Sequence, residues 1–158
     1  MKAVFRSKWW LLLFVPMLMQ NVCGKRDEGD MIIPPNADQY VTWRVNNTNG
    51  SLQVPTDSLD YYFSNNSTSV YGMTRPTMST YFQLSFDGPQ QNGNYAASNF
   101  VVMSGGRHYY SSASPISVNV TTYGGVGQYM IGNYTGTVKD STTSNTVPVS
   151  GTFRIKVR

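Results

Sequence analysis

The end of the chain alternates in side-chain character with a period of two residues, and this pattern restricts the fold more than any other feature. Apolar or small residues occupy every second position, namely Val147, Val149, Gly151, Phe153, Ile155 and Val157. The residues between them are Pro148, Ser150, Thr152, Arg154, Lys156 and Arg158. Side chains of a β-strand point alternately to opposite faces, so residues 147–157 are predicted to form a strand with one buried face.

Similar short segments precede the last one, separated by clusters of Asn, Gly, Pro and Ser that favour turns. Residues 128–139 are predicted to pair with the last strand through the polar connector 140–145, in a long hairpin. In residues 39–46 the apolar side chains alternate with polar ones, and Trp43 is expected to point inward. Three further segments have apolar patterns typical of strands: 80–86, 100–103 and 116–120.

Composition agrees with a fold made of strands. The sequence after residue 37 is rich in Thr, Ser, Asn, Gly and Tyr, and no segment of useful length has the period of an α-helix. Residues 100–103 are apolar without interruption and are expected to be buried throughout. We expect about seven to nine strands in one all-β domain over residues 38–158: an antiparallel β-sandwich, immunoglobulin-like or jelly-roll, with a small β-barrel as the alternative.

The first residues have the character of an export signal. Lys2, Arg6 and Lys8 precede the apolar stretch 9–19. A positively charged start followed by a short apolar run is typical of a signal peptide, here residues 1–22, and the run is shorter than the ~20 apolar residues that span a bilayer. Removing this segment leaves nine basic residues against eight acidic ones. A mature chain so close to neutrality has no basic patch for nucleic acid, which is not an expected partner.

Cys23 is the only cysteine of the chain, so it cannot form an internal disulfide in an exported protein. A covalent lipid on this thiol explains its position directly after the apolar run, and several acyl chains anchor a protein stably to a membrane. The segment resembles a bacterial lipoprotein signal, except that Val22 stands where that family has a small residue and Gln20 where it has leucine. The alternative is cleavage after Gly24 by ordinary signal peptidase, which gives a secreted soluble protein.

Residues 23–37 are expected to form a flexible tether between the lipidated cysteine and the domain. The segment 24–30 (GKRDEGD) is charged, and it resembles the acidic stretch after the cysteine in surface-displayed lipoproteins of Bacteroidota. The ending YMIGNYTGTVKDSTTSNTVPVSGTFRIKVR is similar to the closing hairpin of small lipoproteins of the same phylum. These resemblances imply a lipid-anchored, surface-exposed protein of the outer membrane. Apart from the covalent lipid, no cofactor is expected.

The domain has few side chains that suit catalysis. Its acidic residues and its histidine are Asp38, Asp57, Asp60, Asp87, Asp140 and His108. Glycoside hydrolysis usually needs two facing carboxylates, whereas Asp57 and Asp60 are expected to be turn and cap residues. One histidine, expected to be an ordinary strand residue, supports neither a zinc site nor a Ser-His-Asp triad. Residues 87–94 offer a single carboxylate for Ca²⁺. We therefore expect no enzymatic activity and no metal site.

Tyrosine is the remaining chemical feature. Tyr61 and Tyr62 are adjacent, as are Tyr109 and Tyr110, so on a strand one of each pair points outward. These four are the candidate ligand-binding residues, because exposed rings beside amides can bind sugars. Rings can equally cover a sheet as cross-strand pairs.

We expect a non-enzymatic cell-envelope lipoprotein with an adhesion, assembly or scaffold role, attached to the membrane by its lipid and in contact with envelope proteins. The alternative is a glycan-binding surface lipoprotein of a saccharide uptake system. The two differ in the surface they need, because a glycan-binding protein should expose a line or cleft of aromatic rings near Asn, Asp or Gln. Burial of all four tyrosines would remove the main support for the alternative.

Overall fold

The computed structural model describes residues 38–158, which form ten β-strands and no helix. The strands are β1 (Tyr40–Val45), β2 (Thr48–Gln53), β3 (Ser58–Ser64), β4 (Ser67–Met73), β5 (Tyr81–Asp87), β6 (Gly93–Ser104), β7 (Arg107–Ser111), β8 (Ser117–Tyr123), β9 (Tyr129–Asp140) and β10 (Thr146–Lys156). The all-β prediction is confirmed. In this part of the chain no helix is long and apolar enough to cross a bilayer. The predicted signal peptide, Cys23 and the tether lie outside the described residues.

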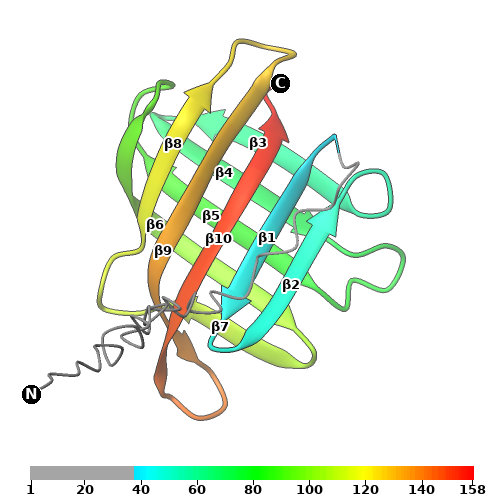
Figure 1. The fold of residues 1–158 in the computed structure, drawn as a ribbon, viewed down its shortest axis with the longest axis vertical. Helices are drawn as coiled ribbons and strands as arrows, with labels where there is room; N and C mark the ends of the chain where they lie inside the picture. The colour runs from blue at the N-terminus through cyan, green and yellow to red at the C-terminus, as the bar shows by residue number, and fades with distance from the viewer. Residues whose placement is uncertain (1–37) are drawn as a thin grey trace, which may run out of the picture. The chain divides into compact units, whose positions relative to one another are not determined.

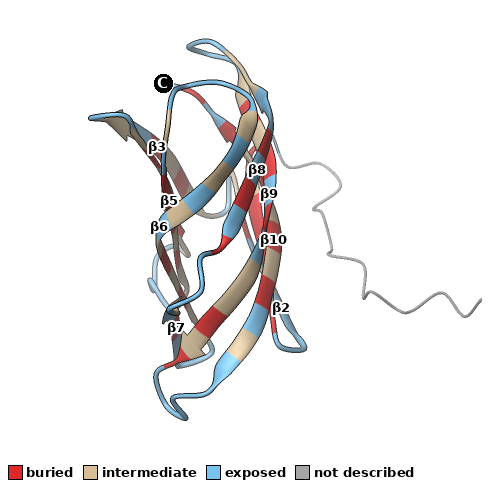
Figure 2. Ribbon diagram, turned by 90° about the vertical axis from the view of Figure 1, so that its left-hand side faces the viewer, coloured by how far each residue is buried: buried red, intermediate tan, exposed pale blue. Residues whose placement is uncertain are grey.

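The strands form one antiparallel sheet that folds over itself into two layers. Its order is β2-β1-β10-β9-β7-β6-β5-β4-β3, and β8 pairs with both β6 and β9. Strands β8, β9, β10, β1 and β2 make one layer and β3 to β7 make the other (Figures 1 and 2). Because β6 and β9 each pair with both β7 and β8, these four strands close into a small barrel. The sandwich and the barrel are thus both present in one fold.

The predicted strand patterns explain the core between the layers. In β10 the residues Val149, Phe153 and Ile155 are buried, and β9 pairs with β10 along its whole length, as predicted. The prediction for residues 100–103 is wrong in part. Phe100 and Val102 are buried, whereas the two residues that alternate with them, Val101 and Met103, are half-buried on the outward face. The run is a regular strand whose outward face is also apolar.

Aromatic rings fill the centre of the core. Trp43 stacks on Phe82 with ring centroids 6.0 Å apart, and Phe82 meets Phe100 edge to face at 5.7 Å. Tyr134 packs against Phe82 at 5.9 Å, and its hydroxyl donates a 2.8 Å hydrogen bond to the backbone carbonyl of Thr42. The phenol is therefore buried with its polar end satisfied.

Two glycines make room for these rings. A Cβ atom on Gly50 would come closer than 3.0 Å to the indole of Trp43, which lies directly opposite it in the register of β1 and β2. A Cβ atom on Gly151 would overlap both the phenol of Tyr134 and the carbonyl oxygen of Thr42. The core thus depends on the absence of a side chain at both positions.

One end of the sandwich is closed by the loop between β5 and β6. Gln90 of this loop donates a 2.7 Å hydrogen bond to the hydroxyl of Tyr61, which is also hydrogen-bonded to Tyr123. Asn92 accepts a 2.6 Å hydrogen bond from the backbone N–H of Tyr123. Burial, and then the bond with Tyr123, raises the pKa of Tyr61. The opposite end is bounded by the β1–β2, β6–β7 and β9–β10 turns (Figure 1).

Candidate functional site

The four tyrosines singled out from the sequence divide as predicted. Tyr61 and Tyr109 point into the sandwich and are each 6% exposed, whereas Tyr62 is 59% exposed and Tyr110 is 41% exposed. Each pair lies on a strand, β3 or β7, where adjacent side chains alternate between the two faces. The outward partners, Tyr62 and Tyr110, both lie on the outer surface of the β3–β7 layer.

This outer surface carries a concentration of aromatic side chains, and we call it the tyrosine face. Strand register places one row of residues side by side across the five strands: Asp60, Tyr71, Gln83, Val101 and Tyr110. The next row consists of Ser58, Met73, Tyr81, Met103 and His108. Tyr62 lies on the same face, opposite Ser69. Rings, thioethers and one amide therefore share a surface exposed to solvent.

Hydrogen bonds fix the polar groups within the tyrosine face. The hydroxyl of Tyr81 donates a 2.8 Å bond to the amide oxygen of Gln83. The amide nitrogen of Gln83 points to the hydroxyl of Ser85 at 3.5 Å, and Ser85 is bonded to Ser69 at 2.8 Å. An amide held between two hydroxyls presents a fixed orientation to a ligand, which lowers the entropy lost on binding.

Asp60 lies at one edge of the same row, and the prediction that it is a turn or cap residue is wrong. It is within β3, facing outward, and forms a 3.1 Å ion pair with Arg158. Burial, followed by the charge of Asp60, raises the pKa of Tyr71 beside it. Asp57 does serve a turn, because its carboxylate accepts a 2.9 Å bond from the backbone N–H of Gln53. In β3 the buried Leu59 and Tyr61 alternate with polar residues, and this alternation places Asp60 on the outward face.

The outer surface of the opposite layer is different. A row of short polar side chains crosses it: Thr42, Thr152, Asn133 and Asn119. The guanidinium of Arg154 lies over the ring of Tyr129 at 4.2 Å, and Tyr129 also donates a hydrogen bond to Asp38. This ring is occupied by a neighbouring side chain, whereas Tyr62 and Tyr110 are open to solvent.

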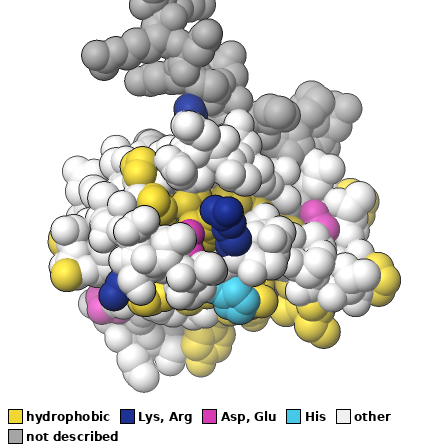
Figure 3. Space-filling view, turned by 90° about the horizontal axis from the view of Figure 1, so that it is seen from below, with side chains coloured by type: hydrophobic (Ala, Val, Ile, Leu, Met, Phe, Trp, Pro, Cys, Tyr) yellow, Lys and Arg dark blue, Asp and Glu magenta, His cyan; other side chains and the backbone are white. Residues whose placement is uncertain are grey.

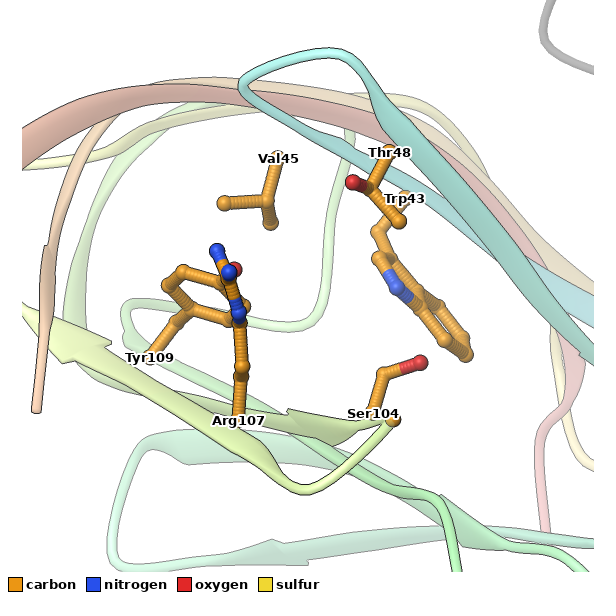
Figure 4. Close-up of a pocket in the computed structure, with 7 residues that line it drawn as sticks. Trp43, Val45, Thr48, Ser104, Arg107 and Tyr109 are labelled. Carbon is orange, nitrogen blue, oxygen red and sulfur yellow. The ribbon is translucent and has the colours of Figure 1, made fainter. Parts of the chain in front are cut away.

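A pocket of about 240 Å³ opens at the end of the sandwich opposite the closed one, and we call it the end pocket. The β1–β2 hairpin forms one wall and the β6–β7 hairpin forms the other. Its lining residues are Trp43, Val45, Thr48, Ser104, Gly105, Arg107 and Tyr109. Seen from this end, a positively charged side chain stands in a hollow with hydrophobic side chains around it (Figure 3). The close-up shows the guanidinium of Arg107 reaching across the pocket towards Val45 (Figure 4).

Among residues 38–158, Arg107 is the only charged residue that lines the end pocket. Its guanidinium is 4.0 Å from the carboxylate of Asp140, which is too far for a hydrogen bond. Asp140 instead accepts bonds from the backbone N–H groups of Thr142 at 2.7 Å and Thr143 at 3.4 Å. The hydroxyl of Tyr109, and then the charge of Asp140, raises the pKa of Arg107, so this side chain stays positive at physiological pH.

The sequence interpretation found part of these surfaces. It named Tyr62, Tyr109 and Tyr110 as candidate ligand-binding residues, but it did not predict the pocket that Tyr109 lines. Trp43 was recognised as a core residue, but its indole also lines the end pocket, and Arg107 was missed because the two hairpins are far apart in the sequence. Among residues 38–158, no three His, Cys, Asp or Glu side chains are grouped so that they could hold a metal ion. Comparison with protein-family models, curated proteins and solved structures found no match to this chain.

Proposed function

We propose that this chain is a non-enzymatic lipoprotein of the cell envelope whose tyrosine face binds glycan. The observation that supports the proposal is the outward row from Asp60 to Tyr110, in which two rings, an amide and a carboxylate lie on five adjacent strands. Neighbouring strands are about 4.8 Å apart, so the row is about 19 Å long. A surface of this length accommodates a short oligosaccharide lying across the strands.

The chemistry of the face matches that of a sugar. A pyranose ring has an apolar face, which packs against an exposed aromatic ring, and a rim of hydroxyls that both donate and accept hydrogen bonds. Tyr62 and Tyr110 supply exposed rings. Gln83 supplies an amide that can do both kinds of bonding, and Asp60 supplies an acceptor.

An adhesion or scaffold role is the second candidate, and the methionines of the tyrosine face favour it. Met73 and Met103 flank Tyr81 in one row, outside the core. Thioether side chains adapt to irregular surfaces and are enriched, with tyrosine, at protein interfaces. In this case the partner is an envelope protein that covers the face.

Removing the two exposed rings tests the binding surface. The double variant Tyr62→Ala with Tyr110→Ala should lose glycan-array signal by at least about tenfold, since each ring contributes on the order of 1 kcal/mol. Tyr40→Ala is the matched control, because Tyr40 is a half-buried tyrosine on the outward side of the other layer. If the double variant bound glycan as strongly as the wild type, glycan binding by the tyrosine face would be refuted. Absence of any array signal, combined with capture of one envelope protein that depends on these rings, would replace glycan by a protein partner.

The membrane anchor has a separate test. Cys23→Ala should release the protein from membranes and abolish labelling with a fatty-acid analogue, because no other cysteine is present. Cys23→Ser serves as the closest control for side-chain size and should behave identically. Membrane association unchanged in both variants would rule out lipidation at this position.

A further inference from the structure

The end pocket is independent of the tyrosine face and has its own chemistry. It lies between hairpins from opposite layers, at the end that the β5–β6 loop does not close. Its volume of about 240 Å³ is below the ~300 Å³ at which pockets for drug-sized ligands begin. The pocket therefore suits a molecule with a single ring.

Trp43 brings a hydrogen-bond donor, its indole N–H, to this pocket. The side chain is only 2% exposed, and within residues 38–158 its Nε1–H has no acceptor. The nitrogen-bearing edge of the indole faces the pocket (Figure 4). Among residues 38–158, the fully buried polar atoms without a partner do not include this nitrogen, so it is reached from the pocket, where an acceptor on a ligand can bind it.

Arg107 adds a positive charge at the mouth. Because Asp140 is already bonded to two backbone N–H groups and is 4.0 Å away, the guanidinium keeps N–H donors for a ligand. A planar guanidinium binds a carboxylate through two parallel hydrogen bonds, a geometry that a neutral group does not reproduce. Arg107 at the mouth of the pocket thus favours an anion with two oxygen atoms in one plane, such as a carboxylate.

The remaining walls are suited to hydroxyl groups and an apolar ring face. The hydroxyls of Thr48 and Ser104 point into the pocket from opposite hairpins (Figure 4). Each can donate and accept a hydrogen bond. Val45 and the ring of Tyr109 give the pocket an apolar surface between these groups.

We propose that the end pocket binds one carboxylate-bearing sugar residue of the hexuronate class. The carboxylate lies on Arg107, ring hydroxyls bond to Thr48, Ser104 and the indole N–H of Trp43, and the ring packs on Tyr109. Free hexuronate and the terminal residue of an acidic polysaccharide present the same groups. The inference does not rest on glycan binding by the tyrosine face.

Residues 31–158 form a compact unit that contains every strand and the whole core, so they can be tested as a folded domain. Trp43 is the only tryptophan in this unit, so its fluorescence reports directly on the pocket. Galacturonate and glucuronate should change the emission and release or absorb heat in calorimetry. Galactose and glucose, which lack the carboxylate, should bind at least about tenfold more weakly.

Two variants and one control identify the residues. Arg107→Gln should weaken hexuronate binding at least about tenfold, and Ser104→Ala should weaken it severalfold without loss of folding. Arg44→Gln is the matched control, because Arg44 lies between Trp43 and Val45 on β1 but points to the outer surface. The double variant at Tyr62 and Tyr110 should bind hexuronate normally, which separates this site from the tyrosine face.

Three outcomes overturn the inference. Equal binding of galactose and galacturonate would remove the role of Arg107, and equal binding of acetate would make the site a general anion site. If up to about 10 mM hexuronate or trigalacturonate gave no fluorescence change and no heat, the pocket would bind neither the free sugar nor the end of a polysaccharide chain. Tighter binding of trigalacturonate than of galacturonate supports the chain end as the ligand.

Discussion

Replacing Gly50 by alanine tests the packing that holds Trp43 between the two layers. Gly50 lies opposite Trp43 on β2, and a Cβ atom there would come closer than 3.0 Å to three atoms of the indole. The ring has little room to retreat, because it stacks on Phe82 at 6.0 Å and is almost completely buried. We expect Gly50→Ala to displace the indole towards the end pocket.

The magnitude follows from two opposing effects. Overpacking of a core costs about 1–3 kcal/mol, whereas alanine in place of glycine gains about 0.4–1 kcal/mol by restricting the unfolded chain. The free energy of unfolding should therefore fall by about 1.5 kcal/mol. With a denaturant dependence of about 2 kcal/mol/M, the urea midpoint moves down by about 0.7 M.

Urea unfolding of residues 31–158 followed by circular dichroism measures this change, and the emission of Trp43 reports whether the indole has moved. Gly125→Ala is the control, because no atom lies within 4 Å of a Cβ at that position and its backbone is not left-handed. The control should match or slightly exceed the wild type in stability. A Gly50→Ala variant as stable as Gly125→Ala, with unchanged emission, would refute the packing argument.

Three further predictions concern the core and the pocket end. Tyr134→Phe should lower the free energy of unfolding by about 1–2 kcal/mol, since it removes the hydroxyl bonded to Thr42; an unchanged urea midpoint would contradict this. Gly151→Ala should destabilise by about 3 kcal/mol or prevent folding, because the added carbon overlaps both of those residues; normal yield and midpoint would count against it. The backbone N–H of Thr142 is the main cause of the lowered pKa of Asp140. The charged carboxylate of Asp140 therefore stabilises the fold above the unfolded-state pKa of about 4, and this stabilisation is lost as the pH falls through the lower folded-state pKa. Asp140→Asn should therefore lose less stability than the wild type between about pH 5 and pH 2; parallel pH profiles would exclude this contribution.

The strands that the sequence predicted are those with one consistently apolar face. In β10 and in residues 41–45, apolar or small residues alternate with polar ones along the sequence, so the positions and inward residues of these strands were readable. β4 was missed because its inward residues are Thr68, Val70 and Gly72, of which only one is clearly apolar. The structure accordingly has ten strands, more than the expected seven to nine.

The sequence could predict only those parts of the candidate sites that follow from the alternation of neighbouring side chains within one strand. The opposite orientations of Tyr109 and Tyr110 follow from their adjacency on a strand. The row that joins Tyr110 to Tyr71 requires the register of three strand pairs, which no short pattern encodes. The end pocket requires in addition that two hairpins from different layers meet, bringing Arg107 near Trp43.

The entry point of the chain into the domain has a mechanical consequence. Asp38 is bonded to Tyr129 at the closed end, and β1 then runs about 20 Å towards the pocket. β1 is paired on both sides, with six residues opposite β2 and six opposite β10. For a chain held at Cys23, a load on the pocket end pulls along these strands, so many hydrogen bonds resist it together in shear instead of opening one at a time. Under the two proposals, a lipid on Cys23 and a ligand in the end pocket, the pairing of β1 on both sides resists the load between them.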